Sequence, residues 1–313
     1  MRIDSTTVRL AIAFALIGLA GLIVPDWAVF LATLALAKAL VVLGLLILWR
    51  TGLVPFGQAL YFGTGAYTVG LLGRLLGATD IVLLTVMGTL IAAALGALVG
   101  VLLARYRDIF FAMLSMAFSM ILYGILLKTE ALGSTDGFNV ESPTFLGYAP
   151  NGQPLQIAIF LWTVLLSFIA AYAVHRYLSS ALGQLAAAIR DNEIRVEYLG
   201  VSVQTAIHIK VVVAAALAGA GGAITAFSVG HIDPDAMCYW TVSGEFVFVT
   251  ILSGTGSIAA PFLGSVIFQV IRTYAFEYSP YTWQMVLGGS LLLIILFVPN
   301  GLWSLVTRLR REG

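Results

Sequence analysis

Charged residues are scarce in this chain of 313 residues. Asp, Glu, Lys and Arg make up only 10% of the sequence, whereas hydrophobic residues make up 60% and the mean hydropathy is +1.01. A soluble globular protein carries about 25% charged residues, so the composition excludes that class. The formal net charge of +1 gives no indication of a polyanionic partner such as nucleic acid.

Cysteine, lysine and histidine are also rare, and each shortage excludes a kind of site. The single cysteine, Cys238, excludes an intrachain disulfide and a cysteine-based metal site. A P-loop needs a lysine after a glycine, and none of Lys38, Lys128 and Lys210 follows one. The three histidines lack metal-ligand spacing, and the chain shows no hydrolase or kinase motif. We therefore predict no catalytic, cofactor or metal site on this chain.

Long apolar runs follow one another along the sequence. Runs of about 17–25 residues match the length that crosses a hydrocarbon core of about 30 Å. They predict an all-α, polytopic integral membrane protein of about ten transmembrane helices, some of them broken or re-entrant. The first run lacks a small-residue cleavage pattern, so we interpret it as a retained span rather than a signal peptide. The predicted spans lie near residues 10–25, 29–48, 56–76, 80–104, 109–127, 156–174, 207–229, 240–253, 258–276 and 282–299.

Basic residues are distributed unevenly over the predicted loops. An even number of spans with both termini in the cytoplasm puts only Arg74 and Lys128 outside, and the outer loops are acidic. Two longer polar stretches interrupt the spans, an outer one of about 128–156 and an inner one of about 175–207. The inner basic set is Arg2, Arg9, Arg50, Arg105, Arg107, Arg176, Arg190, Arg195, Arg308, Arg310 and Arg311.

The inner stretch contains AIRDNEIRVEYLG (residues 188–200), with five charges in eight positions. The spacing of Asp191 and Arg195 predicts a short amphipathic helix outside the bilayer, bracketed by Gly183 and Gly200. A helix lying on lipid usually carries Lys or Arg on its polar face, whereas this one has three acids and two bases. We therefore favour a docking helix for a partner protein over a helix lying on its own membrane domain or on lipid.

Five regions of the chain carry distinctive motifs, namely TGLVPFGQALYFGTGAYTVGLL (51–72), RDIFFAMLSMAFS (107–119), AIRDNEIRVEYLGVSV (188–203) with ALAGAGGAITA (216–226), GTGSIAAPFLGSVIF (254–268) and LFVPNGLWSL (296–305). In this order they resemble segments of permease subunits in branched-chain amino acid ABC importers. The outer loop and the RDNE sequence resemble the M-type subunit of the high-affinity, Liv-type systems, which pairs with an H-type permease. Gln58 stands where this subunit type commonly has His, so the resemblance leaves the exact substrate open.

The resemblance implies a single transmembrane permease domain over residues 1–313 in a bacterial or archaeal cytoplasmic (inner) membrane. It implies import of branched-chain or related small amino acids, amides or carboxylates. The implied partners are an H-type permease in a heterodimer, two ATP-binding cassette subunits that hold ATP and Mg, a periplasmic or lipid-anchored binding protein, and membrane lipid. This chain would then be a transport subunit rather than an enzyme.

In the implied mechanism, the segment from Arg190 to Gly200 sits in a groove of the ATPase. Acidic and basic side chains would fix the docking, and Ile194, Tyr198 and Leu199 would supply buried area. The expected coupling residues are Arg190, Asp191, Asn192, Glu193, Ile194, Arg195, Glu197, Tyr198, Leu199 and Gly200.

Glycine and proline interrupt the predicted third span and the region before the ninth. Such interruptions in both halves of a transporter point to the substrate route. For any single glycine, close helix packing is an equal alternative, and we assign ALAGAGG (216–222) to packing. The predicted pathway residues are Gln58, Tyr61, Gly63, Thr64, Gly65, Tyr67, Glu245, Gly254 and Gly256.

Two charged residues, Lys38 and Glu245, fall within predicted spans. Insertion costs of about 2.5–3.5 kcal/mol at mid-membrane make such residues functional candidates. The two side chains could pair, or each could reach water.

Two other functional classes stay open from the residues alone. An ion-coupled secondary transporter would need several mid-membrane acids, and only Glu245 is a candidate. An integral membrane enzyme would need catalytic residues clustered at one membrane face.

Overall fold

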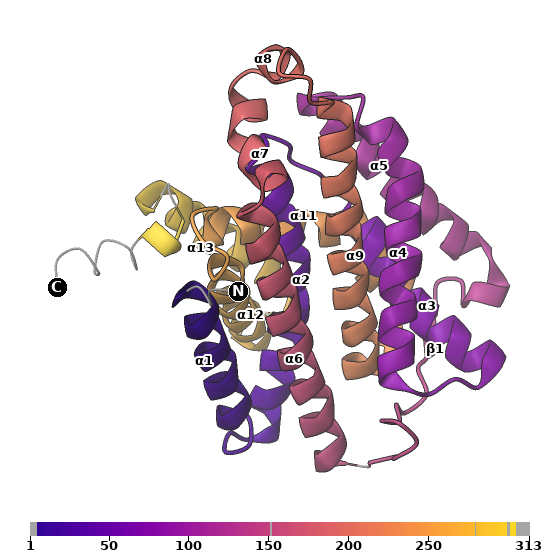
Figure 1. Ribbon diagram of the computed structural model, residues 1–313. Helices are drawn as coiled ribbons and strands as arrows, with labels where there is room; N and C mark the ends of the chain where they lie inside the picture. Colours follow the sequence, from indigo (N-terminus) through magenta and orange to yellow (C-terminus); the bar gives the residue numbers. More distant parts are fainter. Residues whose placement is uncertain (1–4, 151, 279, 299–300, 305–313) are drawn as a thin grey trace, which may run out of the picture.

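The structure is a computed structural model that describes residues 5–150, 152–278, 280–298 and 301–304 (Figure 1). Most of these residues are helical, so the predicted all-α class is confirmed. The elements are α1 (Ser5–Ala20), α2 (Asp26–Trp49), α3 (Gln58–Leu76), α4 (Ile81–Leu103), α5 (Asp108–Lys128), η1 (Glu130–Leu132), β1 (Phe138–Asn139), α6 (Gln153–Leu178), α7 (Ala181–Asp191), α8 (Glu193–Glu197), α9 (Val203–Val229), β2 (His231–Ile232), α10 (Pro234–Cys238), α11 (Trp240–Ser253), α12 (Ala260–Tyr278) and α13 (Trp283–Phe297).

Each of the ten predicted spans coincides with a helix. Among the described residues, six segments are long and apolar enough to cross a membrane: α2, α4, α5, α6, α9 and Pro234–Ser253, which comprises α10 and α11. The apolar helices α1 and α13 are shorter, and α3 and α12 have 19 residues each. The main error is in α1, which begins at Ser5 rather than near residue 10. The basic residues at positions 2, 308, 310 and 311 lie outside the described residues.

Helix α9 lies at the centre of the bundle, packed against α2, α3 and α4 (Figure 1). Its small residues permit contact between backbones, as is common between membrane helices. A Cβ at Gly219 would overlap Ala92 of α4, one at Gly221 would overlap the carbonyl oxygen of Ala37, and one at Gly222 would overlap that of Phe62. The assignment of the ALAGAGG segment to packing therefore agrees with the structure.

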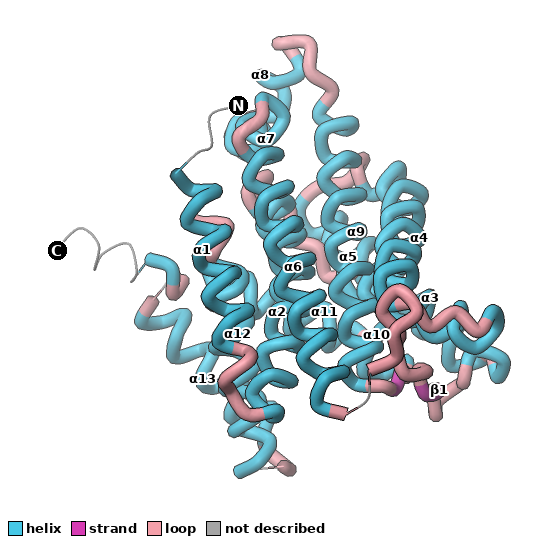
Figure 2. The backbone as a smooth tube through the Cα atoms, turned by 60° about the horizontal axis from the view of Figure 1, so that its bottom comes forward, coloured by secondary structure: helices cyan, strands magenta, loops and turns pink. Residues whose placement is uncertain are grey.

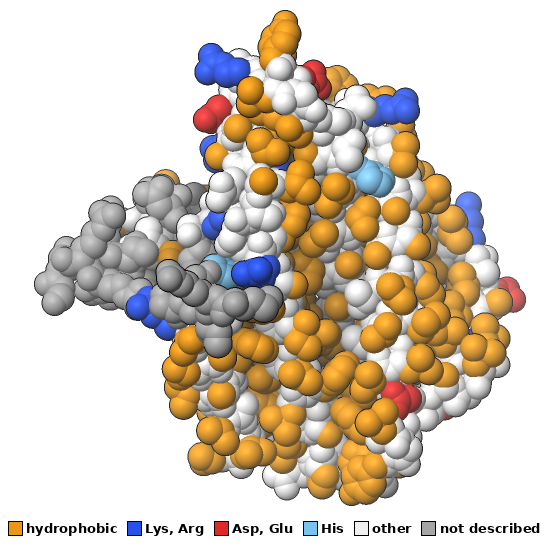
Figure 3. Space-filling model, viewed as in Figure 1, with side chains coloured by type: hydrophobic (Ala, Val, Ile, Leu, Met, Phe, Trp, Pro, Cys, Tyr) orange, Lys and Arg blue, Asp and Glu red, His pale blue; other side chains and the backbone are white. Residues whose placement is uncertain are grey.

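The two polar stretches lie at opposite ends of the bundle, with α7 and α8 at one end and β1 at the other (Figures 1 and 2). At the β1 end, Phe138 and Asn139 pair antiparallel with Ile232 and His231. In Figure 3, charged side chains gather near α7 and α8, whereas hydrophobic side chains cover most of the face below them. This separation agrees with the predicted alternation of polar ends and apolar spans.

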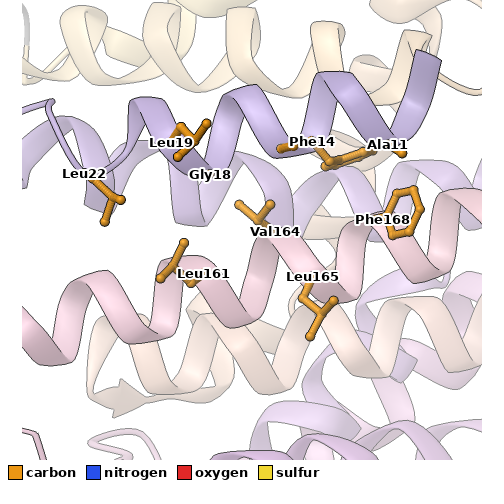
Figure 4. A pocket seen from close by; sticks show the side chains of 10 residues that line it. Ala11, Phe14, Gly18, Leu19, Leu22, Leu161, Val164, Leu165 and Phe168 are labelled. Carbon is orange, nitrogen blue, oxygen red and sulfur yellow. The ribbon is translucent and has the colours of Figure 1, made fainter. Parts of the chain in front are cut away.

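A wholly apolar groove of about 530 Å³ runs between α1 and α6 (Figure 4). Phe14 and Phe168 meet edge to face beside it, with ring centroids 6.0 Å apart. Because its walls offer no polar side chain, the groove lacks the means to recognise a charged substrate.

The backbone contact at Gly222 leads to a stability prediction. Gly222→Ala should lower the free energy of unfolding by about 1–3 kcal/mol, because the new Cβ would overlap the Phe62 carbonyl oxygen. Gly124→Ala on α5, where a Cβ meets nothing within 4 Å, is the matched control and should be neutral or slightly stabilising. Thermal denaturation of the detergent-purified protein measures both. Equal melting temperatures for the two variants would contradict the packing argument.

Candidate coupling and translocation sites

The predicted docking segment is two helices rather than one. Asn192 is extended (φ −163°, ψ 102°), and its side chain accepts a hydrogen bond from the backbone N–H of Arg195 at 3.0 Å. This N-cap ends α7 and begins α8, so Asp191 and Arg195 do not share a helix and the predicted i,i+4 pair is wrong. Gly183 was also wrong as a terminator, since it lies in the first turn of α7 behind the Ser180 cap. Gly200, at φ +81°, closes the segment as predicted.

Three large apolar side chains at the tip of this segment have no cover. Ile194 is 66% exposed, Tyr198 87% and Leu199 76%. Ile189 and Val196, by contrast, are each 2% exposed and belong to the main core cluster. The segment is thus held against the bundle by one face and presents an apolar surface at its end.

The tip is fixed to α5 by an ion pair. Nε of Arg107 donates to Oε1 of Glu193, and Nη1 of Arg107 also donates to the carbonyl oxygen of Ala104 at 2.7 Å. Glu193, which we expected to face the ATPase, is therefore engaged within this chain. Arg195 and Glu197 are exposed and keep their charges available to a partner.

The α2–α3 junction (residues 50–57) joins several elements at the α7 end. The Thr51 hydroxyl accepts a 2.7 Å hydrogen bond from Nζ of Lys210 on α9, and the Phe56 N–H donates to Ser115 Oγ on α5 at 3.0 Å. A Cβ at Gly52 would lie 3.3 Å from Cγ of Arg190, so α7 rests on this junction. Any displacement of α7 therefore acts on a segment bonded to α5 and α9.

A second irregular segment, the α11–α12 junction (residues 254–259), lies beside the first. Nε and Nη2 of Arg50 donate to the carbonyl oxygen of Thr255 at 3.2 and 3.0 Å. Burial lowers the pKa of the Arg50 guanidinium from its ordinary value. Gly254 is buried at φ +78°, whereas Gly256 is exposed. The interruptions predicted in the two halves of the chain are thus in direct contact.

The predicted pathway residues of α3 divide between the core and a cavity. Thr64 and Tyr67 line an apolar cavity of about 360 Å³ between α3, α4, α5 and η1. The Tyr67 hydroxyl is buried and has no hydrogen-bond partner among the described residues. Gln58 and Tyr61 are almost wholly buried, and neither lines this cavity.

Gly63 and Gly65 do not interrupt α3, which is continuous from Gln58 to Leu76. A Cβ at Gly63 would overlap Sγ of Cys238, and one at Gly65 would overlap the carbonyl oxygen of Gly219. The alternative of close packing therefore explains both glycines, and the irregular backbone is confined to the preceding junction.

Lys38 and Glu245 do pair, and a third charge joins them. Nζ of Lys38 lies 3.2 Å from Oε2 of Glu245, and Nη1 of Arg272 lies 3.1 Å from the same oxygen. Lys38 also lies 5.7 Å from the ring centroid of Phe268, and the Arg272 guanidinium lies 5.6 Å from that of Trp283. We call these three residues the charge triad. It connects the middle of α2 to α11 and α12 and carries an excess of one positive charge.

Sequence reasoning missed Arg272, Lys210 and Arg107 as functional candidates, and it counted Arg107 only among the basic residues of the inner loops. Lys210 is wholly buried. For Arg272, a signal was available, since it falls within the helical run of predicted span 258–276. A carboxylate near the middle of a membrane span, such as that of Glu245, usually pairs with a nearby cation.

Comparison with known proteins identifies the family. The profile of the family described as "Branched-chain amino acid transport system / permease component" matches residues 27–296. The chain belongs to this family. The predicted resemblance is confirmed at this level, and helix α1 lies before the matched region.

Two curated relatives are similar to the chain in sequence. The high-affinity branched-chain amino acid transport system permease protein LivM of Escherichia coli is 28% identical over 295 residues, covering 87% of this chain and 69% of LivM. The protein of the same name from Salmonella typhimurium gives the same values. No solved structure matches the chain significantly. Similarity to LivM is compatible with the M-type subunit, and the choice between M-type and H-type stays a prediction.

The charge triad predicts an asymmetric pattern of stability losses. Glu245→Gln should cost about 3–5 kcal/mol, because it leaves the buried Lys38 and the partly exposed Arg272 without an anion. Lys38→Met should cost less, since Arg272 still pairs with Glu245. The double variant should be more stable than Glu245→Gln alone. Thermal denaturation of the three detergent-purified variants tests this, and simply additive losses would argue against contact.

Proposed function

We propose that this permease is the membrane subunit of an ATP-driven importer in the cytoplasmic membrane, with both termini in the cytoplasm. It pairs with a second, H-type permease and takes branched-chain or related small amino acids from a separate binding protein. Membership of the permease family and similarity to LivM support the transport class. ATP and Mg are held by two ATPase subunits, since no lysine of this chain follows a glycine.

The observation that carries the proposal is the apolar tip formed by Ile194, Tyr198 and Leu199. These three side chains are uncovered although the same segment buries Ile189 and Val196. An aromatic and two aliphatic residues, flanked by exposed charges, match the composition of a buried interface centre with a polar rim. We propose that this tip inserts into a groove of the ATPase.

The contacts below the tip support a role in transmitting motion. Arg107 holds α8 to α5, and Arg190 packs on the α2–α3 junction. A force applied by the ATPase at Tyr198 would therefore reach the junction, and through Arg50 and Thr255 the second half of the chain. In this proposal, nucleotide-driven closure of the ATPase pair moves both junctions together.

Substitutions at the tip test the docking. Ile194→Asp with Tyr198→Asp should reduce co-purified ATPase at least about tenfold, because a buried interface anchor is typically worth 2 kcal/mol or more. Leu182→Asp, an exposed apolar position in the first turn of α7, is the matched control and should keep the ATPase. The measurement is subunit stoichiometry after affinity purification of the co-expressed complex.

Two results would contradict the proposal. One is undiminished ATPase association and uptake in the tip variant. The other is a stable preparation without any ATPase that transports on an ion gradient, which would favour a secondary transporter.

A further inference from the structure

The charge triad reaches the surface of the chain at membrane depth. The side chain of Glu245 is 18% exposed and that of Arg272 is 36% exposed, although Glu245 lies near the middle of the span Pro234–Ser253. Thr241, one turn before Glu245 on α11, is exposed as well. Charged side chains at this depth face protein or a water-filled cavity rather than hydrocarbon. The face of α11 and α12 that carries these residues is therefore not a lipid face.

The electrostatics of this face favour an anion. Lys38 and Arg272 share one carboxylate oxygen of Glu245, so the triad retains one uncompensated positive charge. A guanidinium binds a carboxylate through paired N–H donors, and Arg272 has the greatest exposure of the three side chains. An incoming carboxylate would thus meet a donor that is already partly open.

The core-facing side of α12, below Arg272, carries buried polar groups without partners among the described residues. Ser265, Phe268, Gln269 and Arg272 recur at i, i+3, i+4 and i+7, which places them on one side of the helix. Gln269 is 7% exposed, and its Oε1 has no hydrogen-bond partner among the described residues; the same is true of Ser265 Oγ. A buried acceptor of this kind costs stability unless a donor reaches it.

We propose that the α11–α12 face lines the translocation pathway, and that the charge triad binds the carboxylate of the transported amino acid through Arg272. The inference rests on the proposed import function and assigns to that function a site and a substrate group. The anion could instead be an acidic side chain of the second permease, and the experiment separates the two.

Thiol labelling of the assembled complex in membranes tests the location. Thr241→Cys should react with small water-soluble methanethiosulfonates, because the proposed pathway contains water. Leu16→Cys, which is 61% exposed on α1, is the lipid-facing control and should stay unreactive. The native Cys238 is buried and provides the blank. Labelling of Thr241→Cys as slow as that of Leu16→Cys would overturn the pathway assignment. Labelling of Thr241→Cys seen only when the second permease is absent would also overturn the pathway assignment. It would indicate that an acidic side chain of the second permease covers this face.

The sign of the reagent tests the anion site. An anionic methanethiosulfonate should label Thr241→Cys at least about threefold faster than a cationic one, and Arg272→Gln should abolish this preference. Arg74→Gln, which removes another arginine stacked on an aromatic ring, should leave it unchanged. Equal rates for the two reagents would overturn carboxylate binding.

Transport gives an independent readout of the same residue. Arg272→Gln should lower the kcat/KM for L-leucine uptake about tenfold or more, and Arg272→Lys should lower it less. Co-purified ATPase should be unchanged in both, because Arg272 is not part of the proposed docking tip on α8. Unchanged uptake by Arg272→Gln in a complex that transports L-leucine would overturn the proposal. Failure of the unmodified complex to bind its ATPase would instead count against the proposed import function. The labelling of Thr241→Cys would then decide the pathway assignment by itself.

Discussion

A bilayer offers no hydrogen bonds, and this constraint determines where the polar groups of the protein lie. Backbone irregularity at membrane depth has to be enclosed by protein or open onto water. The α2–α3 junction, at the α7 end of the bundle, satisfies its polar groups through Lys210, Ser115 and the carbonyl oxygen of Thr255, which accepts from Arg50. The side chains of the charge triad satisfy one another by forming ion pairs. Polar surface that stays exposed at membrane depth, as on α11 and α12, then indicates contact with water, a substrate or a second protein.

The two regions assigned to function are connected through the junctions. The tip of α8 is held by Arg107, and α7 packs on the α2–α3 junction. That junction is bonded to the α11–α12 junction, and α11 and α12 carry Glu245 and Arg272. The structure thus provides a continuous set of contacts from the proposed ATPase-facing tip to the proposed substrate site.

The sequence predicted the helices well because hydrocarbon thickness sets their length. All ten span ranges coincide with helices, and the family was recognised from motifs. The sequence could not separate the two uses of glycine: Gly63 and Gly65 serve packing inside an intact helix, and only the surroundings reveal this. It also missed the N-cap at Asn192, because i,i+4 spacing does not reveal that a single extended residue divides the segment into two helices. Arg272 was missed although it lies within a predicted span, and its pairing with Glu245 on another helix depends on tertiary structure.

The close packing of α9 has a mechanical consequence. Where Gly65 meets Gly219 and Gly222 meets Phe62, the touching atoms belong to main chains, which have no rotamers to exchange. Sliding or tilting at these contacts would produce immediate steric overlap, so α3 and α9 must travel as one rigid body. In the proposed import cycle, relative movement of helices therefore has to occur at interfaces other than the one between α3 and α9.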